Sequence, residues 1–300
     1  MLHHLVIKHV RRLFGVAAIC AFASALSVSA TEAPVVIRDV AYLPASRSEK
    51  LDVWLPPASF AGPRPTVLVI HGGGWAVGDK ADPRERNFAD TLARAGYVVF
   101  SINYFLEKTE KLENGRVRIL EMPWPQNVAD CKTALRFIRK NAATYRVDPA
   151  RIAVMGGSAG AHLAMLVGVT GNDDNLNRLG DYAGQSNQVS CIVYFYGTAD
   201  LRRFGHEHFH GATPQETEHN LDIASPRTYI TAKTPPLLIV HGANDTTIPV
   251  ALSRDLAADL KAAGATYDYV EVPGAPHSFD LRQPGADLTG TVLTFLGEHL

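Results

Sequence analysis

Cysteine is scarce in this sequence, and neither sign of charge is in excess. Only three of the 300 residues are cysteine, and no Cys/His spacing resembles that of a zinc site. The 29 basic and 30 acidic residues nearly cancel, so the charge balance gives no reason to expect a nucleic-acid or anionic-membrane partner. Internal repeats and low-complexity stretches are absent as well, which favours one folded domain.

The start of the chain has an apolar run that is too short to span a bilayer. Leu13–Leu26 has 14 residues, whereas a membrane-spanning helix needs roughly 20. Three basic residues precede the run: Lys8, Arg11 and Arg12. The small residues Val28-Ser29-Ala30 follow it, as at a signal peptidase site. We expect residues 1–30 to be a signal peptide cleaved after Ala30, the product to be secreted or periplasmic, and residues 31–300 to form the domain. An uncleaved membrane anchor is the alternative.

Cleavage would leave two cysteines, Cys131 and Cys191, and a net charge of about −4, because three basic and no acidic residues lie in the leader. An exported protein could join the two as a disulfide. Cys131 falls in a helical pattern and Cys191 in a strand pattern, so two separately buried thiols are the other possibility.

Strand and helix patterns alternate along the chain from Val35 onward. The predicted strands span 35–43, 51–55, 66–70, 97–102, 151–155, 189–196, 237–240 and 267–272. The predicted helices span 87–95, 125–145, 161–166, 250–263 and 286–300. Alternation of this kind with continuous apolar strands predicts an α/β fold with a mostly parallel sheet covered by helices on both faces.

One polar segment, 198–234, interrupts the alternation and shows no sustained period. A stretch of this length inside a compact domain is either a lid or binding insert or a surface excursion. It contains four histidines: His206, His208, His210 and His219. A metal could be held by the first three with Glu207 or Glu216, but the spacing matches no recognised ligand pattern, and we expect no metal.

Gly156-Gly157-Ser158-Ala159-Gly160 places a serine between glycines, after a predicted strand and before a predicted helix. A serine on such a turn has a strained backbone and an exposed oxygen, and glycines are needed where a Cβ would clash with the neighbouring strand or helix. Ser158 is therefore the candidate nucleophile.

A serine nucleophile needs a base and an acid that orients the base. Asp245 follows the strand 237–240, and His277 follows the strand 267–272. Ser158, Asp245 and His277 thus occur in the chain order expected for this arrangement, each after its own strand.

Four other polar residues are weaker candidates. His162 lies one helical turn past Ser158 and is expected to pack, and His241 is expected to secure the Asp245 loop. Asp200 fits the 198–234 segment better than the site. Asp280 is a substitute acid only if Asp245 faces solvent.

When a serine attacks the carbonyl carbon of a substrate, the carbonyl oxygen becomes an anion. This anion needs at least two fixed N–H donors. His71-Gly72-Gly73-Gly74-Trp75 follows a buried strand, and consecutive glycines let backbone amides turn inward. The expected donors are the amides of Gly73, Gly74 and Ala159.

With these motifs the chain resembles the α/β-hydrolases, specifically the carboxylesterases related to hormone-sensitive lipase and, among them, the bacterial feruloyl- and acetyl-esterase-like group. Further matching stretches are 50–56, 78–80, 130–132, 148–152, Ser225-Pro226 and Pro235-Pro236. The chain departs from that pattern twice: Gly157 stands where relatives commonly carry an acid, and Phe105 follows Tyr104 where many carry arginine.

The resemblance implies a secreted serine ester hydrolase that needs no metal or organic cofactor. It would form an acyl-enzyme on a small-molecule or oligosaccharide ester of short-chain or aryl type, such as an acetyl or feruloyl ester. The alternatives are a peptidase or arylformamidase on the same fold and a catalytically inactive binding protein.

Overall fold

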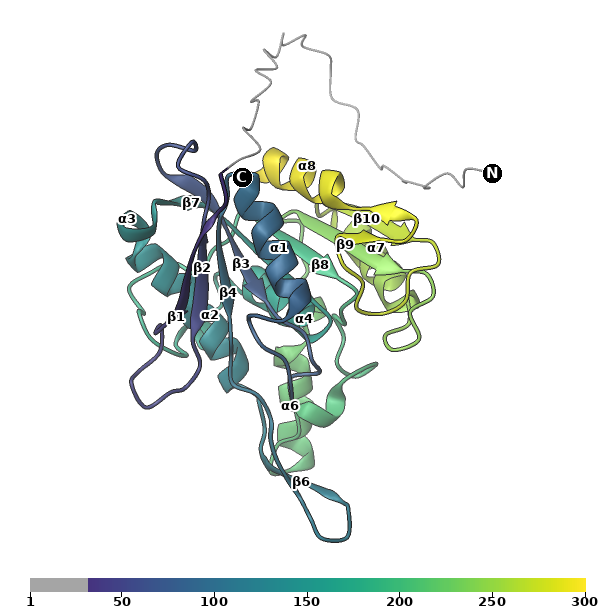
Figure 1. Ribbon diagram of the computed structural model, residues 1–300. Helices are drawn as coiled ribbons and strands as arrows, with labels where there is room; N and C mark the ends of the chain where they lie inside the picture. Colours follow the sequence, from purple (N-terminus) through teal and green to yellow (C-terminus); the bar gives the residue numbers. More distant parts are fainter. Residues whose placement is uncertain (1–31) are drawn as a thin grey trace.

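An eight-stranded sheet runs through the computed structural model of the protein, which describes residues 32–300 (Figure 1). In spatial order its strands are β1 (Val35–Val40), β2 (Leu51–Leu55), β4 (Val98–Ile102), β3 (Arg64–Ile70), β7 (Val147–Gly157), β8 (Cys191–Phe195), β9 (Leu237–Gly242) and β10 (Tyr267–Val272). β1 and β2 pair antiparallel, as do β2 and β4, whereas β4 to β10 run parallel. The predicted α/β class is confirmed. The expected signal peptide, residues 1–30, lies outside the described residues.

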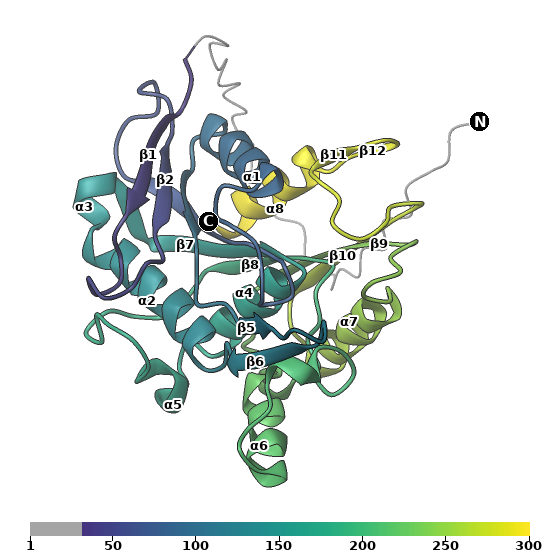
Figure 2. The ribbon, with the colours of Figure 1, turned by 60° about the horizontal axis from the view of Figure 1, so that its bottom comes forward.

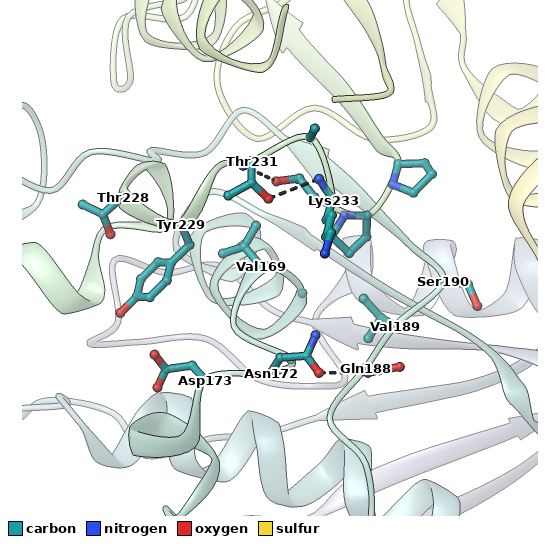
Figure 3. Close-up of a pocket in the computed structure, with 16 residues that line it drawn as sticks. Val169, Asn172, Asp173, Gln188, Val189, Ser190, Thr228, Tyr229, Thr231 and Lys233 are labelled. Atoms are coloured by element: carbon teal, nitrogen blue, oxygen red, sulfur yellow. Dashed lines mark hydrogen bonds between the residues drawn. The ribbon is translucent and has the colours of Figure 1, made fainter. Parts of the chain in front are cut away.

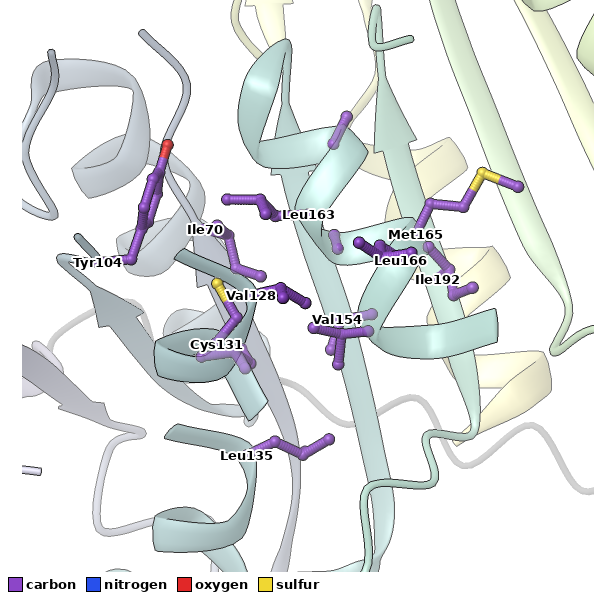
Figure 4. Packing of buried hydrophobic residues seen from close by; sticks show 14 of the residues in the cluster. Ile70, Tyr104, Val128, Cys131, Leu135, Val154, Leu163, Met165, Leu166 and Ile192 are labelled. Carbon is purple, nitrogen blue, oxygen red and sulfur yellow. The ribbon is translucent and has the colours of Figure 1, made fainter. Parts of the chain in front are cut away.

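Helices cover both faces of the sheet (Figure 1). One face packs against α2 (Gln126–Lys140), α4 (Ala159–Val169) and α7 (Ala251–Ala263). The other face packs against α1 (Pro83–Arg94) and α8 (Thr289–His299). Alternate residues of each strand point to opposite faces, so in β3 Leu68 and Ile70 join the first layer and Val67 and Val69 the second. Figure 4 shows side chains of the first layer between α2, α4 and the strands.

The two cysteines lie on opposite faces of the sheet as separate buried thiols. Cys131 on α2 belongs to the first layer and Cys191 on β8 to the second. Burial raises the pKa of the Cys191 thiol to about 12 and that of Cys131 well above its usual value, so neither is a reactive thiolate. Of the two possibilities left open by the sequence, the structure therefore has the separate thiols.

Several predicted boundaries differ from those in the structure. The helix predicted over 125–145 breaks at Asn141, which leaves helical geometry (φ −107°, ψ 20°) and separates α2 from α3 (Ala142–Tyr145). The closing helix begins at Thr289 because Ala286–Asp287 forms β12, paired with β11 (Arg282–Gln283). A short helix, α5 (Asp174–Asn177), was not predicted.

A hairpin between β4 and α2 was also not predicted. It consists of β5 (Lys108–Lys111) and β6 (Val117–Glu121), whose residues are all exposed. Its sequence signal is Asn114-Gly115, a dipeptide typical of hairpin turns; Gly115 has φ 79°. The hairpin projects beside the 198–234 insert, as Figures 1 and 2 agree.

The insert is more regular than the sequence suggested. It contains the 3₁₀ helix η1 (His206–His208), the helix α6 (Pro214–Ala224) and the 3₁₀ helix η2 (Pro226–Tyr229). α6 starts at a cap that could have been recognised: Thr213 Oγ1 accepts the Glu216 N–H at 3.1 Å, and proline occupies the first helical position.

None of the helices within residues 32–300 has the length and apolar character required to cross a membrane.

The first turn of α4 lies very close to β3. A Cβ at Gly160 would lie 2.0 Å from the carbonyl oxygen of Ile70, and a Cβ at Gly156 would lie 2.3 Å from that of Gly160. Real Cβ atoms do not approach backbone so closely, and here both partners are backbone. Glycine at these two positions therefore permits the packing that brings α4 against the central strands.

We predict that Gly160→Ala lowers the free energy of unfolding by about 1–3 kcal/mol, since the added methyl group forces the backbone apart. Gly297→Ala in α8 is the matched control, because a Cβ there meets nothing within 4 Å; it should raise the free energy of unfolding by about 0.5–1 kcal/mol. Urea unfolding curves of both variants measure the effect. Equal stabilities would show that the close contact is not a constraint.

Candidate functional site

The turn from β7 into α4 presents Ser158 at the edge of the sheet. Ser158 has φ 58° and ψ −124°, and its amide donates to the Phe195 carbonyl at 2.9 Å, which anchors the turn to the end of β8. A positive φ is uncommon for a residue other than glycine and is held only by surrounding structure. The side chain is half-buried, at the N-terminus of α4.

The structure brings Ser158, His277 and Asp245 together. His277 Nε2 lies 3.0 Å from Ser158 Oγ, and His277 Nδ1 lies 2.6 Å from Asp245 Oδ2. The three residues follow the carboxyl ends of β7, β10 and β9, which meet at one edge because the strands are parallel. A hydroxyl, an imidazole and a carboxylate in this chain of contacts can move a proton from the serine to the histidine.

Asp245 is held by its own loop. Oδ1 accepts the amides of Thr247 and Ile248, each at 2.8 Å, and Oδ2 contacts His241 Nε2 at 3.1 Å as well as His277. Its side chain is fully buried. The orientation of the carboxylate is therefore set before His277 binds it, and the condition under which Asp280 would substitute for it does not arise.

The His241 ring contacts the Asp245 loop in a single, neutral protonation state. Burial lowers its pKa, so the ring is neutral at neutral pH. Nε2 lies 2.9 Å from the Ile248 carbonyl, which can only accept, so Nε2 carries the proton. Nδ1 then accepts the Ser253 hydroxyl at 2.6 Å.

The remaining candidates lie elsewhere. His162 contacts the Ala224 carbonyl and the Trp75 indole, not Ser158 Oγ. Asp200 pairs with Arg227 inside the insert at 3.1 Å. Asp280 accepts the side-chain amide of Asn87.

The glycine loop after β3 lies against Ser158. A Cβ at Gly72 would be 3.3 Å from the Ser158 Cβ and 2.8 Å from the Gly157 carbonyl. Gly73 and Gly74 have φ 107° and 59°, a region open to glycine. Within residues 32–300 the amides of Gly73, Gly74 and Ala159 donate to no protein acceptor. These N–H groups are thus free to bind a ligand oxygen.

Tyr196 was not singled out from the sequence, where it is only the last residue of a predicted strand. Its ring lies edge-on to His277 at 5.1 Å between centroids, and its hydroxyl donates to the Phe279 carbonyl at 2.8 Å. A Cβ at Gly157 would be 3.0 Å from this ring. A side chain at 157, the position of the first departure, would therefore press against the Tyr196 ring.

The second departure also has a structural account. The amide of Phe105 donates to Asp130 Oδ2 at 2.8 Å, and the same carboxylate binds both Nη atoms of Arg47, at 3.1 and 2.6 Å. The Arg47 guanidinium lies over the Phe105 ring. The guanidinium that binds Asp130 and packs on the Phe105 ring therefore comes from Arg47 in the β1–β2 loop, and not from position 105.

The histidine-rich stretch of the insert is split between different neighbours. His208 Nδ1 lies 2.8 Å from Glu107 Oε2, while His206 and His210 lie with their ring centroids 6.3 Å apart. In the described part of the chain, no group of three His, Cys, Asp or Glu side chains is placed to hold a metal ion.

A cavity of about 790 Å³ lies at the opposite end of the strands (Figure 3). Its walls include Val189-Ser190 and Pro235-Pro236, which precede β8 and β9, and the side chains of Asp173, Tyr229 and Lys233. None of the predicted site residues lines it. This cavity is therefore separate from the candidate catalytic residues.

A family model and a curated esterase each match most of this chain. The BD-FAE family model matches residues 51–260. The esterase LipQ of Mycobacterium tuberculosis is 33% identical over 257 residues, which cover 81% of this chain and 57% of LipQ. The chain thus spans little more than half the length of this relative.

Two solved structures share the fold. A truncated carbohydrate esterase from gut microbiota superposes with a TM-score of 0.75 at 24% identity, over 89% of this chain and 97% of that one. Esterase 2 of Thermogutta terrifontis, phosphoramylated by tabun, has a TM-score of 0.66 at 26% identity, over 89% and 92% of the two chains. The predicted family resemblance is confirmed: this chain belongs to the BD-FAE family of α/β-hydrolase carboxylesterases.

Proposed function

We propose that this chain is a serine carboxylic-ester hydrolase. The observation that carries the proposal is the pair of contacts from His277, to Ser158 Oγ at 3.0 Å and to Asp245 Oδ2 at 2.6 Å. Membership of a carboxylesterase family supports it independently. No step of the proposed reaction calls for a metal or an organic cofactor.

In the proposed reaction Ser158 Oγ attacks the ester carbonyl carbon while His277 Nε2 takes its proton. The tetrahedral intermediate then expels the alcohol, which receives that proton from His277, and an acyl-enzyme remains. His277 next deprotonates a water molecule that attacks the acyl carbon, and Ser158 recovers its proton as the acid leaves. Asp245 holds Nδ1–H, keeps the imidazole in the required tautomer and stabilises the imidazolium.

The amides of Gly73, Gly74 and Ala159 are the proposed donors to the oxyanion of each tetrahedral intermediate. Ala159 is the first residue of α4, so the positive end of the helix dipole points at the same oxygen. Losing one such donor typically costs about 10²–10³ in rate.

For the substrate we propose a short-chain or aryl ester of acetyl or feruloyl type. Structures of Thermogutta terrifontis esterase 2 with bound butyrate and propionate, at 26% identity, support a short acyl group. Export of the protein, which we also propose, would direct it to esters outside the cytoplasm, such as an acylated oligosaccharide.

The proposed function predicts hydrolysis of p-nitrophenyl acetate by the mature protein and its loss in Ser158→Ala, because the variant cannot form the acyl-enzyme. Release of p-nitrophenol measures the initial rate. A rate that persists in Ser158→Ala would contradict the mechanism. Absence of both hydrolysis and labelling by a fluorophosphonate would favour a binding protein, whereas labelling without hydrolysis would favour the peptidase or arylformamidase.

Asp245→Asn should lower kcat by about 10⁴, because the amide stabilises the wrong tautomer of His277. Asp280→Asn is the matched control: it makes the same change three residues past His277, on a side chain bonded to Asn87. It should retain most of the activity. A larger loss in Asp280→Asn than in Asp245→Asn would reverse the assignment of the acid.

The proposed export predicts that the protein recovered from the periplasm or medium of a bacterial host begins at Thr31. Mass spectrometry of the N-terminal peptide tests this directly. A chain that retains Met1 in the membrane fraction would identify an uncleaved anchor instead.

A further inference from the structure

The glycine loop after β3, residues 71–75, is called the oxyanion loop because it carries the amides of Gly73 and Gly74. Its backbone is unusual at three consecutive residues. Gly73, Gly74 and Trp75 have φ values of 107°, 59° and 57°. Glycine adopts such values without steric cost, but a bulky residue does not. A tryptophan in this conformation persists only where neighbouring groups hold it. Trp75 directly follows the two amides proposed to bind the oxyanion, so whatever holds Trp75 also sets those amides.

The Trp75 indole is enclosed by α4, the helix that follows Ser158, and by the insert. Its Nε1–H donates to His162 Nδ1 at 3.2 Å. The ring is edge-on to Phe209 with centroids 5.2 Å apart, and a Cβ at Gly205 would lie 2.6 Å from it. Only 2% of Trp75 is exposed. The insert thus packs directly against the indole of the residue that follows Gly73 and Gly74.

His162 connects three elements through one ring. It lies on α4, four residues past Ser158, and its Nε2 is 2.8 Å from the carbonyl of Ala224, the last residue of α6. Since a carbonyl only accepts, Nε2 carries the proton. Burial lowers the pKa of His162 to about 4, so the ring is neutral and Nδ1 is free to accept the indole N–H.

A second connection holds the backbone of Trp75. Its carbonyl accepts the Glu107 amide at 2.9 Å. The Glu107 carboxylate, which is 7% exposed, contacts His208 Nδ1 at 2.8 Å, and the His208 ring lies tilted against the indole. The insert therefore reaches Trp75 both through the side chain and through the segment that binds its backbone.

We propose that Trp75 is a positioning residue for the oxyanion amides. His162 of α4, which contacts the insert at the Ala224 carbonyl, and Phe209 and Gly205 of the insert itself hold the indole in place. This inference rests on the proposed esterase function. It gives the segment 205–224 a role in forming the oxyanion site. If this segment moved away as a lid, it would remove the contacts that keep Gly73 and Gly74 in position.

The test compares Trp75→Phe with Trp124→Phe. Trp75→Phe keeps an aromatic ring but removes the N–H that His162 accepts, so kcat should fall by roughly 10-fold or more, below the full cost of a lost donor, with little change in KM. Trp124→Phe is the matched control. Trp124 donates to Asn220 of the insert at 3.3 Å and packs near Phe209, without a bond to the oxyanion loop. It should retain kcat.

Binding of phenylboronic acid supplies a second readout, which depends on the position of the oxyanion amides and not on turnover. Its adduct with Ser158 places an oxygen where the oxyanion forms, so its affinity should fall in parallel with kcat in Trp75→Phe and not in Trp124→Phe. Unchanged kcat in Trp75→Phe, or equal losses in both variants with a raised KM, would overturn the inference.

A second pair of variants applies if Trp75→Phe does not fold. His162→Asn keeps an acceptor near the position of Nδ1, whereas His162→Leu removes it. The asparagine variant should retain more of kcat than the leucine variant at equal melting temperature. Equal kcat values would overturn the inference. An inactive wild-type chain would overturn the proposed function itself, whereas an active wild type with an unaffected Trp75→Phe overturns this inference alone.

Discussion

The close approach of α4 to β3 is the contact on which the rest of the site depends. Gly160 lies so near the Ile70 carbonyl that a Cβ there would be only 2.0 Å from its oxygen. This contact places the start of α4, and so Ser158 and the Ala159 amide, beside the loop that leaves β3. Because β9 and β10 run parallel to β7 and β3 in the same sheet, Asp245 and His277 arrive at the same edge. The sheet topology thus brings together residues that lie far apart in the sequence.

Sequence patterns predicted the residues of this arrangement but not all of the surrounding structure. Ser158, Asp245 and His277 could be selected because each follows a predicted strand and local glycines or turns mark the place. Whether Cys131 and Cys191 are paired could not be predicted, since it depends on which face of the sheet each side chain meets. Tyr196 was missed for the same reason: its contact with His277 joins two strand ends and has no local signal.

Two of the missed elements, the β5–β6 hairpin and α6, differ from Tyr196, because local signals for them were present. Asn114-Gly115 marks the β5–β6 hairpin, and Thr213-Pro214 with Glu216 marks the start of α6. Both elements carry mostly polar, exposed residues, so a search for apolar periodicity passes over them. They follow the carboxyl ends of β4 and β8, where parallel α/β sheets bind ligands. Segments at this edge are therefore better examined by caps and turns than by hydrophobic pattern.

The parts of the site are held to different degrees, and the difference suits the proposed chemistry. Asp245 receives two backbone amides and His241 in addition to His277, so its position is independent of the reaction. His277 is fixed at Nδ1 by this carboxylate and along its ring by Tyr196. Nε2 alone remains available, and it must face first Ser158, then the leaving alcohol and then water. A rigid acid and a base held everywhere except at its reacting nitrogen allow these transfers without rearrangement of the loops.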